Sequence, residues 1–221
     1  MKTARALIFD FNGTLFWDTA YHQKAWASIA EKYGKSPYTE GQMHMLNGRT
    51  NSETIAFLVG EKLPPGQVKA ISEEKERLYI DMCRSSMPLS LAPGAVSLFE
   101  RARKRGIKLA IATSAGPDNM QWYKRWFSLS SYFADHLIIT DDSRRAGKPD
   151  PAIYLETLAA LELEGSSCIV FEDTKNGILS ASRAGIGTIY AIASDGADIG
   201  TTEAMGETHG LLSGFDQFVL E

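Results

Sequence analysis

The sequence has little of what marks secreted, membrane-spanning or nucleic-acid-binding proteins. Its 221 residues include only two cysteines, Cys83 and Cys168, which lie too far apart to indicate a disulfide framework or a zinc site. No apolar stretch approaches the roughly 20 residues of a membrane span, and the apolar run after residues 1–5 is too short for a signal peptide. The net charge is −4 and no basic block occurs, so nucleic-acid binding has little electrostatic support. We therefore expect a cytoplasmic monomer without a nucleic-acid or membrane partner.

The chain does contain the alternation of apolar and amphipathic segments that is typical of an α/β protein. Apolar runs without polar alternation predict buried parallel strands, as expected when helices cover both faces of a sheet. These strands fall at residues 6–9, 107–113, 136–140, 168–171 and 187–192. Helical patterns lie between the later ones, at residues 95–105, 117–127, 151–163 and 176–184. The order predicts right-handed βαβ units and a doubly wound parallel sheet.

Residues 18–87 break this rhythm, because they show helical periodicity and almost no strand signal. The longest pattern covers residues 67–83 and places Val68, Ile71, Leu78 and Met82 on its inward face. We predict that residues 1–17 and 88–221 form an α/β core. Residues 18–87 would then be a small helical cap domain, inserted after the first strand and able to cover the ends of the sheet.

The most informative segment is Asp10-Phe11-Asn12-Gly13-Thr14, directly after the first apolar run. In open α/β sheets, ligands bind outside the carboxyl ends of the strands. A carboxylate fixed there could attack phosphorus or hold a metal ion. Asn-Gly is also a strong hairpin signal, and Asp often caps helices. The hairpin is disfavoured because Leu15-Phe16-Trp17 lacks the alternation expected of a partner strand.

Three further candidates follow later predicted strands. Thr113-Ser114 could hold a phosphate oxygen with a hydroxyl and main-chain N–H groups, or Thr113 could cap the next helix. Lys148, with Pro149 fixing the backbone after it, could neutralise an attacking carboxylate and the transferred group, or be a solvated loop lysine. The acid pair Glu172-Asp173 suits a hard cation such as Mg²⁺, although one acid could instead cap the following helix.

Together these segments resemble the four motifs of the haloacid dehalogenase (HAD) superfamily, and the insertion is similar to the helical cap of its β-phosphoglucomutase-like group. The resemblance implies a Rossmann-like core in which Asp10 is the nucleophile, assisted by Asn12, Thr113 and Lys148 as catalytic residues. It also implies Mg²⁺ bound by Asp10, the main-chain carbonyl of Asn12, Glu172 and Asp173. Substrate contacts are expected from His22, Trp26, Gly48, Arg49, Ser114 and Asn176. For Trp26 a place in the helix core remains open, as does solvation for His22 and Arg49.

Position 12 departs from the motif, because the family has a second Asp there that exchanges protons with the leaving group and the attacking water. Asn12 cannot exchange a proton at neutral pH. Three interpretations stay open: a natural variant with another base such as His22, a deliberately weakened enzyme, or a protein that binds a phosphorylated ligand and turns it over poorly. Phosphonate cleavage through an imine on Lys24 and C–halogen chemistry are further alternatives, the latter disfavoured by the acid pair.

The sequence thus predicts Mg²⁺-dependent phosphoryl transfer, through an aspartyl-phosphate, on a small phosphorylated metabolite such as a sugar phosphate. A phosphatase fits Asn12 better than a mutase, because a mutase needs the missing acid to carry protons twice. The alternative is a catalytically weakened protein that binds or senses a phosphorylated metabolite on the same scaffold.

Overall fold

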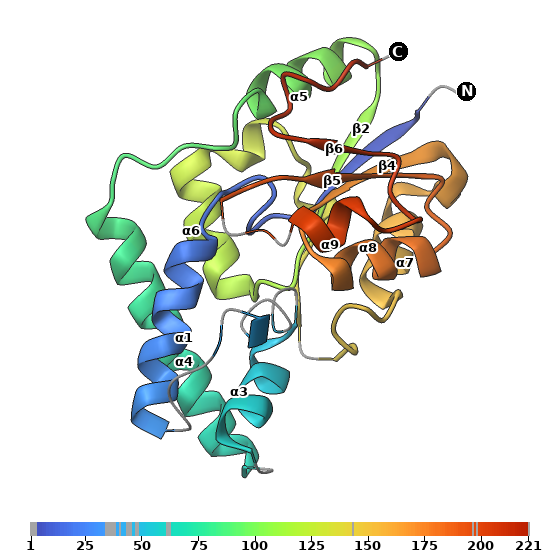
Figure 1. Cartoon of the computed structure of the whole chain (residues 1–221). Coiled ribbons are helices and arrows are strands. Elements are labelled where there is room, and N and C mark those ends of the chain that lie inside the picture. Colours follow the sequence, from blue (N-terminus) through green and yellow to red (C-terminus); the bar gives the residue numbers. More distant parts are fainter. Residues whose placement is uncertain are drawn as a thin grey trace.

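The computed structural model describes residues 4–33, 39, 41–42, 46, 49–60, 63–142, 144–195, 197 and 199–220. Its centre is a parallel sheet of six strands in the order β3-β2-β1-β4-β5-β6 (Figure 1). The strands are β1 (Ala6–Phe9), β2 (Lys108–Ala112), β3 (Ile138–Ile139), β4 (Cys168–Glu172), β5 (Thr188–Ile192) and β6 (Gly210–Leu212). This confirms the predicted α/β architecture. Strand β6, which has only three residues, was not predicted from the sequence.

Strand β1 lies in the middle of the sheet, paired with β2 on one side and β4 on the other. All four of its residues are buried, and they alternate between two apolar layers. Leu7 and Phe9 pack with α5 (Ala95–Lys104) and α6 (Pro117–Phe127), whereas Ala6 and Ile8 pack with α7 (Ala152–Leu161) and α8 (Lys175–Arg183). A strand covered on both faces needs apolar residues throughout, which explains the unbroken run Ala6-Leu7-Ile8-Phe9.

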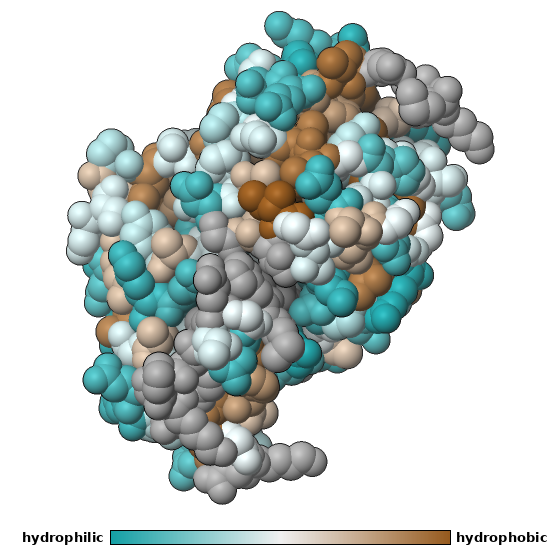
Figure 2. All heavy atoms as spheres, in the orientation of Figure 1, coloured by the Kyte–Doolittle hydropathy of each residue, from teal (hydrophilic) through white to brown (hydrophobic). Residues whose placement is uncertain are grey.

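The predicted strands and helices of the α/β core agree with the structure to within a few residues, but no helix was predicted at residues 199–203. Helix α9 (Ile199–Glu203) contacts β5 and α8, and short 3₁₀ turns occur at Leu129–Ser131, Asp135–Leu137 and Gly165–Ser167. The second of these turns takes up His136, so the predicted strand over residues 136–140 shrinks to Ile138–Ile139. On the face seen in Figure 2, hydrophilic and near-neutral residues surround smaller hydrophobic areas. Among the described residues, no helix is both long and apolar enough to cross a membrane.

Between β1 and α5 the described residues form three helices: α1 (Thr19–Tyr33), α3 (Asn51–Val59) and α4 (Pro65–Ser85). They lie together beside the carboxyl ends of the strands (Figure 1) and share an apolar cluster that includes Trp26, Ile29, Ile55, Leu58 and Ile71. The second half of α4 joins the apolar layer of the sheet instead, through Tyr79, Ile80 and Cys83. The helical content of this region is as predicted, and its division into a separate domain stays a prediction.

The inward face of α4 differs in detail from the prediction. The fully buried residues are Ile71, Lys75, Tyr79, Ile80 and Cys83, whereas Val68, Leu78 and Met82 are half-buried. Spacing of four residues puts Ile71, Lys75, Tyr79 and Cys83 on one stripe. The prediction missed this stripe because it counted only aliphatic residues, and a lysine and a tyrosine occupy two of its positions.

Candidate active site

Three acids meet where β1 and β4 end. Asp10 follows the last residue of β1, Glu172 is the last residue of β4, and Asp173 comes next. Because β1 and β4 are paired in parallel, with Phe9 opposite Phe171, their carboxyl ends emerge side by side. One carboxylate oxygen from each acid lies within 4.8 Å of the others, and all three side chains are buried. The cluster has the oxygen donors and the spacing to hold a metal ion.

Lys148 reaches this cluster from the loop between β3 and α7. Its Nζ donates to Asp10 Oδ1 at 2.6 Å, to Glu172 Oε1 at 2.5 Å and to the Ala112 carbonyl oxygen at 3.2 Å. Only 2% of the residue is exposed, so the solvated-loop interpretation is wrong. Tyr154, on α7, also donates to Glu172 Oε1, at 2.6 Å. Tyr154 was not predicted as a site residue, because nothing local in the sequence distinguishes it from a core tyrosine.

The electrostatics of the cluster favour a bound cation. Burial raises the pKa of Asp10 to about 7, since it outweighs the opposing effect of Lys148, and the charge on Glu172 adds to the rise. Burial, with Asp10 and Glu172 beside it, also raises the pKa of Asp173 well above its usual range. Burial lowers the pKa of Lys148, but the two acids bonded to it outweigh that effect and raise it. One ammonium therefore leaves three buried acids short of positive charge, and a divalent cation would supply it.

The turn after Asp10 is shaped against this cluster. Gly13 has a φ of +78°, and a Cβ added there would lie 2.0 Å from Asp173 Oδ2. Thr14 Oγ1 donates to Asp173 Oδ1 at 3.2 Å. The next regular element is the helix α1, so the hairpin interpretation of Asn12-Gly13 is wrong. Glycine is required here both for its left-handed backbone and for the space it leaves to the acid.

The side chain of Asn12 is held by a buried polar group. Its Nδ2 donates to Asp18 Oδ2 at 2.6 Å and to the Tyr123 hydroxyl at 3.0 Å. Asp18 is fully buried and also accepts from the main-chain N–H of Gly13 at 3.1 Å and from the Tyr79 hydroxyl. No role was predicted for Asp18 or for the two tyrosines, which come from α4 and α6.

Helix capping does not explain the other candidates. Thr113 is buried at the end of β2, and its Oγ1 accepts from the Ala115 N–H at 3.1 Å, while the N-cap of α6 is Gly116. The N-cap of α8 is Thr174, whose hydroxyl accepts from the Gly177 N–H at 3.0 Å, so neither Glu172 nor Asp173 caps that helix.

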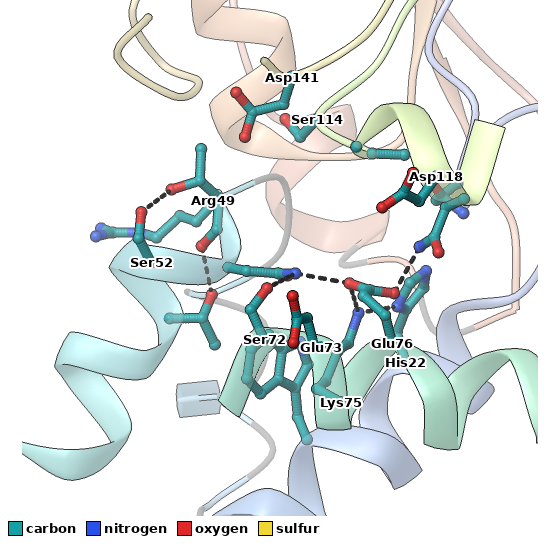
Figure 3. Close-up of a pocket in the computed structure, with 18 of the residues that line it drawn as sticks. His22, Arg49, Ser52, Ser72, Glu73, Lys75, Glu76, Ser114, Asp118 and Asp141 are labelled. Carbon is teal, nitrogen blue, oxygen red and sulfur yellow. Dashed lines mark hydrogen bonds and ion pairs between the residues drawn. The ribbon is translucent and has the colours of Figure 1, made fainter. Parts of the chain in front are cut away.

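A pocket of about 1080 Å³ opens between the acid cluster and helices α1, α3 and α4 (Figure 3). Its lining includes most of the predicted site residues, from both sides of the gap: Asp10, Asn12, Thr113, Ser114 and Asp173, and opposite them His22, Trp26 and Arg49. Asn176 lies in the first turn of α8, outside this lining. Gly48 falls outside the described residues. The pocket therefore joins the acid cluster to a larger space that side chains of α1, α3 and α4 line.

The predicted residues on α1 have more than one role or partner. Trp26 is both a member of the helical apolar cluster and a lining residue. His22 is half-buried and stacks on Tyr79 at 3.9 Å between ring centroids. Its Nδ1 lies 2.9 Å from Lys75 Nζ and its Nε2 3.3 Å from Asp18 Oδ2. Lys24 is exposed, which removes the support for an imine on that residue.

The comparisons with known proteins agree with this geometry. Residues 4–185 match the family model for haloacid dehalogenase-like hydrolases. The phosphorylated carbohydrates phosphatase of Thermotoga maritima is 32% identical over 192 residues, which cover 85% of this chain and 84% of that protein. The chain belongs to the haloacid dehalogenase-like hydrolases, and within them it is similar to phosphatases and phosphomutases.

Two further relatives support the assignment. The β-phosphoglucomutase of Bacillus subtilis is 27% identical over 187 residues, covering 82% of this chain and 80% of that one. The crystal structure of an HAD hydrolase of family IA, variant 3, from Entamoeba histolytica superposes with a TM-score of 0.86 at 35% identity, over 98% of this chain and 96% of that one. The match extends over both the sheet and the inserted helices.

Proposed function

We propose that this protein is a Mg²⁺-dependent phosphatase of small phosphorylated sugars, with Asp10 as the nucleophile. The observation that carries the proposal is Asp10 itself, buried at the floor of the pocket, hydrogen-bonded to Lys148 and beside Glu172 and Asp173. The phosphorylated carbohydrates phosphatase of T. maritima supports the substrate class.

In the proposed reaction, a carboxylate oxygen of Asp10 attacks phosphorus, and the bond from phosphorus to the sugar oxygen breaks with its electron pair on that oxygen. Water then attacks phosphorus, and the bond from phosphorus to the Asp10 oxygen breaks with its electron pair on that oxygen, which releases phosphate and restores Asp10. The sugar oxygen takes up a proton from solvent and the attacking water loses one to solvent, because Asn12 carries neither. Lys148 opposes the protonation of Asp10 and neutralises charge on the transferred group. Thr113 and the N–H groups at the start of α6 hold its oxygens. Mg²⁺, held by Asp10, Asp173, Glu172 and the main-chain carbonyl of Asn12, would neutralise the negative charge that gathers there.

The proposal includes a role for the inserted helices and a preference for hydrolysis. Residues 18–87 act as a cap that closes over the pocket and excludes bulk water. Asn12 can orient water or a leaving group by hydrogen bonding, but it cannot donate and recover a proton. The loss of proton transfer at position 12 should slow a phosphatase less than a mutase, because a mutase cycle needs two proton transfers at that position.

The second candidate is a protein that binds a phosphorylated metabolite without turning it over, favoured by the amide at position 12. Phosphate release from p-nitrophenyl phosphate and acetyl phosphate, with and without Mg²⁺, separates the two. We expect Mg²⁺-dependent turnover that Asp10→Ala abolishes. No turnover of either ester, together with tight binding of a phosphosugar that Asp10→Asn leaves unchanged, would establish the second candidate instead.

A further inference from the structure

A mixed group of charged and amide side chains lies on the wall that α4 contributes to the pocket, and its centre is Glu76 (Figure 3). Glu76 Oε1 accepts from Asn51 Nδ2 at 2.7 Å and from Lys75 Nζ at 2.9 Å. Its Oε2 accepts from Asn119 Nδ2 at 2.5 Å. Asn51 begins α3 and Asn119 belongs to α6, so one carboxylate joins both sides of the pocket.

Glu76 remains an anion throughout the physiological range. Burial would raise its pKa, but the charges of Lys75 and His22 and the hydrogen bonds from Lys75 and Asn119 outweigh burial and hold it at about 2. Lys75 is 2% exposed, lies 5.1 Å from the centre of the Trp26 ring, and bonds to His22 Nδ1 as well as to Glu76. The two opposite charges are thus fixed on the wall, and the carboxylate is the more exposed of the two, since 25% of the Glu76 side chain is exposed against 3% of the Lys75 side chain.

The pair keeps some hydrogen-bonding capacity for a ligand. A carboxylate has about four acceptor positions and an ammonium has three donors. The bonds described above use three positions on Glu76 and two donors on Lys75. A quarter of the Glu76 side chain is exposed, and both residues line the pocket. A hydroxyl group, which donates and accepts at once, suits an acceptor and a donor placed side by side.

We propose that Glu76, Lys75 and Asn119 bind hydroxyl groups of the uncharged part of the substrate, and that Glu76 excludes substrates that carry a second phosphate. The inference rests on the proposed phosphatase function and narrows it to monophosphates of sugars or polyols. A second phosphate at this wall would meet the Glu76 carboxylate, with Glu73, Asp81 and Asp118 also in the lining. Like charges a few ångströms apart in a partly buried site repel strongly.

Cations in the same lining define the competing outcome. Arg49, Arg77 and Arg84 line the pocket too, and an arginine fork binds phosphate well. If they govern recognition, a bisphosphate is the better substrate and Glu76 does not matter. The charge at residue 76 is therefore the variable to change.

The test compares the unaltered chain with Glu76→Gln, and uses Glu74→Gln as a matched control. Glu74 is on the same helix but pairs with Lys32 and Tyr33, outside the pocket lining. The substrates are glucose 6-phosphate and sorbitol 6-phosphate as monophosphates, fructose 1,6-bisphosphate, and acetyl phosphate, which has no polyol part. The readouts are kcat and KM for phosphate release, with circular dichroism as the check of folding.

We expect the unaltered chain to prefer at least one monophosphate over the bisphosphate by tenfold or more in kcat/KM. The substitution Glu76→Gln should reduce that ratio of kcat/KM values at least tenfold, mainly through changes in KM. The kcat/KM for acetyl phosphate should stay within about twofold of its value in the unaltered chain. Glu74→Gln should change neither. A preference for the bisphosphate in the unaltered chain, or one that Glu76→Gln does not alter, overturns the proposal.

Absence of acetyl phosphate turnover would count against the phosphatase function alone. Calorimetric affinities of Asp10→Asn, with and without Glu76→Gln, for glucose 6-phosphate, sorbitol 6-phosphate and fructose 1,6-bisphosphate then decide the inference. The bisphosphate should bind at least tenfold more weakly than the better monophosphate, and Glu76→Gln should reduce that difference. Equal affinities for the three ligands would overturn it.

Discussion

The substitution Asn12→Asp restores the acid of the family motif, and the structure defines what that carboxylate would meet. The Asn12 amide nitrogen lies 2.6 Å from Asp18 Oδ2. Two ionised carboxylates at that separation would repel by about 6 kcal/mol at an effective dielectric constant of about 20. Keeping one of them protonated at pH 7, about three units above its ordinary pKa, costs about 4 kcal/mol. Protonating one carboxylate costs less free energy than the repulsion between two ionised ones, so the two acids should share one proton at neutral pH.

A shared proton next to the nucleophile is what general acid catalysis requires. Asn12 lines the pocket with Asp10, so the new acid would face the leaving group. Positioned acid–base groups contribute about 10²–10⁴-fold, and we expect a gain of that order in kcat on a sugar monophosphate. Acetyl phosphate, whose leaving group needs no proton, should gain much less in its first step.

The assay is steady-state phosphate release from both substrates by the original chain and by Asn12→Asp, beside Asn12→Asp/Asp18→Asn. In the double variant the 2.6 Å contact again joins one amide to one carboxylate, with the two exchanged, so no proton is shared there. The double variant should therefore lose most of the gain in kcat and recover any lost thermal stability. A folded Asn12→Asp variant with no gain on the sugar phosphate would refute the assignment of position 12 as the missing acid.

Three further measurements test the acid cluster. The substitution Gly13→Ala places a Cβ 2.0 Å from Asp173 Oδ2 at a residue with positive φ. Phosphatase activity should therefore fall at least about 100-fold, and calorimetry should show weaker Mg²⁺ binding. Unchanged Mg²⁺ binding would contradict the close packing of the turn against Asp173. The substitution Lys148→Met leaves the buried acids Asp10 and Glu172 without their ion-pair partner, so the unfolding free energy measured by chemical denaturation should fall by about 3–5 kcal/mol. Turnover should be abolished. Retained turnover would exclude Lys148 from the mechanism. In EDTA, folded Asp10 keeps its proton up to about pH 7 but the unfolded chain loses it near pH 4, so the folded state binds more protons in that window and stability falls as pH rises. The Tm in EDTA should accordingly be lower at pH 7.5 than at pH 5.5, and Mg²⁺ should reverse this order. A Tm that depends on neither pH nor Mg²⁺ would contradict the raised pKa of Asp10.

The acids at the core of the site were predictable because each of them has a local signal. Asp10 and the Glu172-Asp173 pair end apolar runs, and parallel strands bring such ends to one edge of the sheet. Lys148 was predictable only jointly with them, since a lone loop lysine is normally solvated. Its burial depends on the acids that it neutralises, and no pattern around residue 148 encodes them.

The partners that lie far apart in the sequence were not predictable in the same way. Tyr154 and Lys75 occupy helix positions whose spacing indicates a buried face, and that pattern says nothing about which polar group the face will meet. Glu76 sits one residue beyond the stripe and reads as an exposed acid until α3 and α6 are placed beside it. These contacts arise from packing between helices, and a single sequence does not specify the angle at which helices pack.

The environment of Asn12 also bears on why an amide stands there. Asp18 is fully buried, and its two oxygens accept from Asn12 Nδ2, the Gly13 N–H and the Tyr79 hydroxyl. A buried carboxylate needs such donors, and an aspartate at position 12 could supply one only by holding a proton. The amide at position 12 supplies a donor to Asp18 without holding an exchangeable proton, so the turn after Asp10 is stabilised while proton transfer at this position is lost.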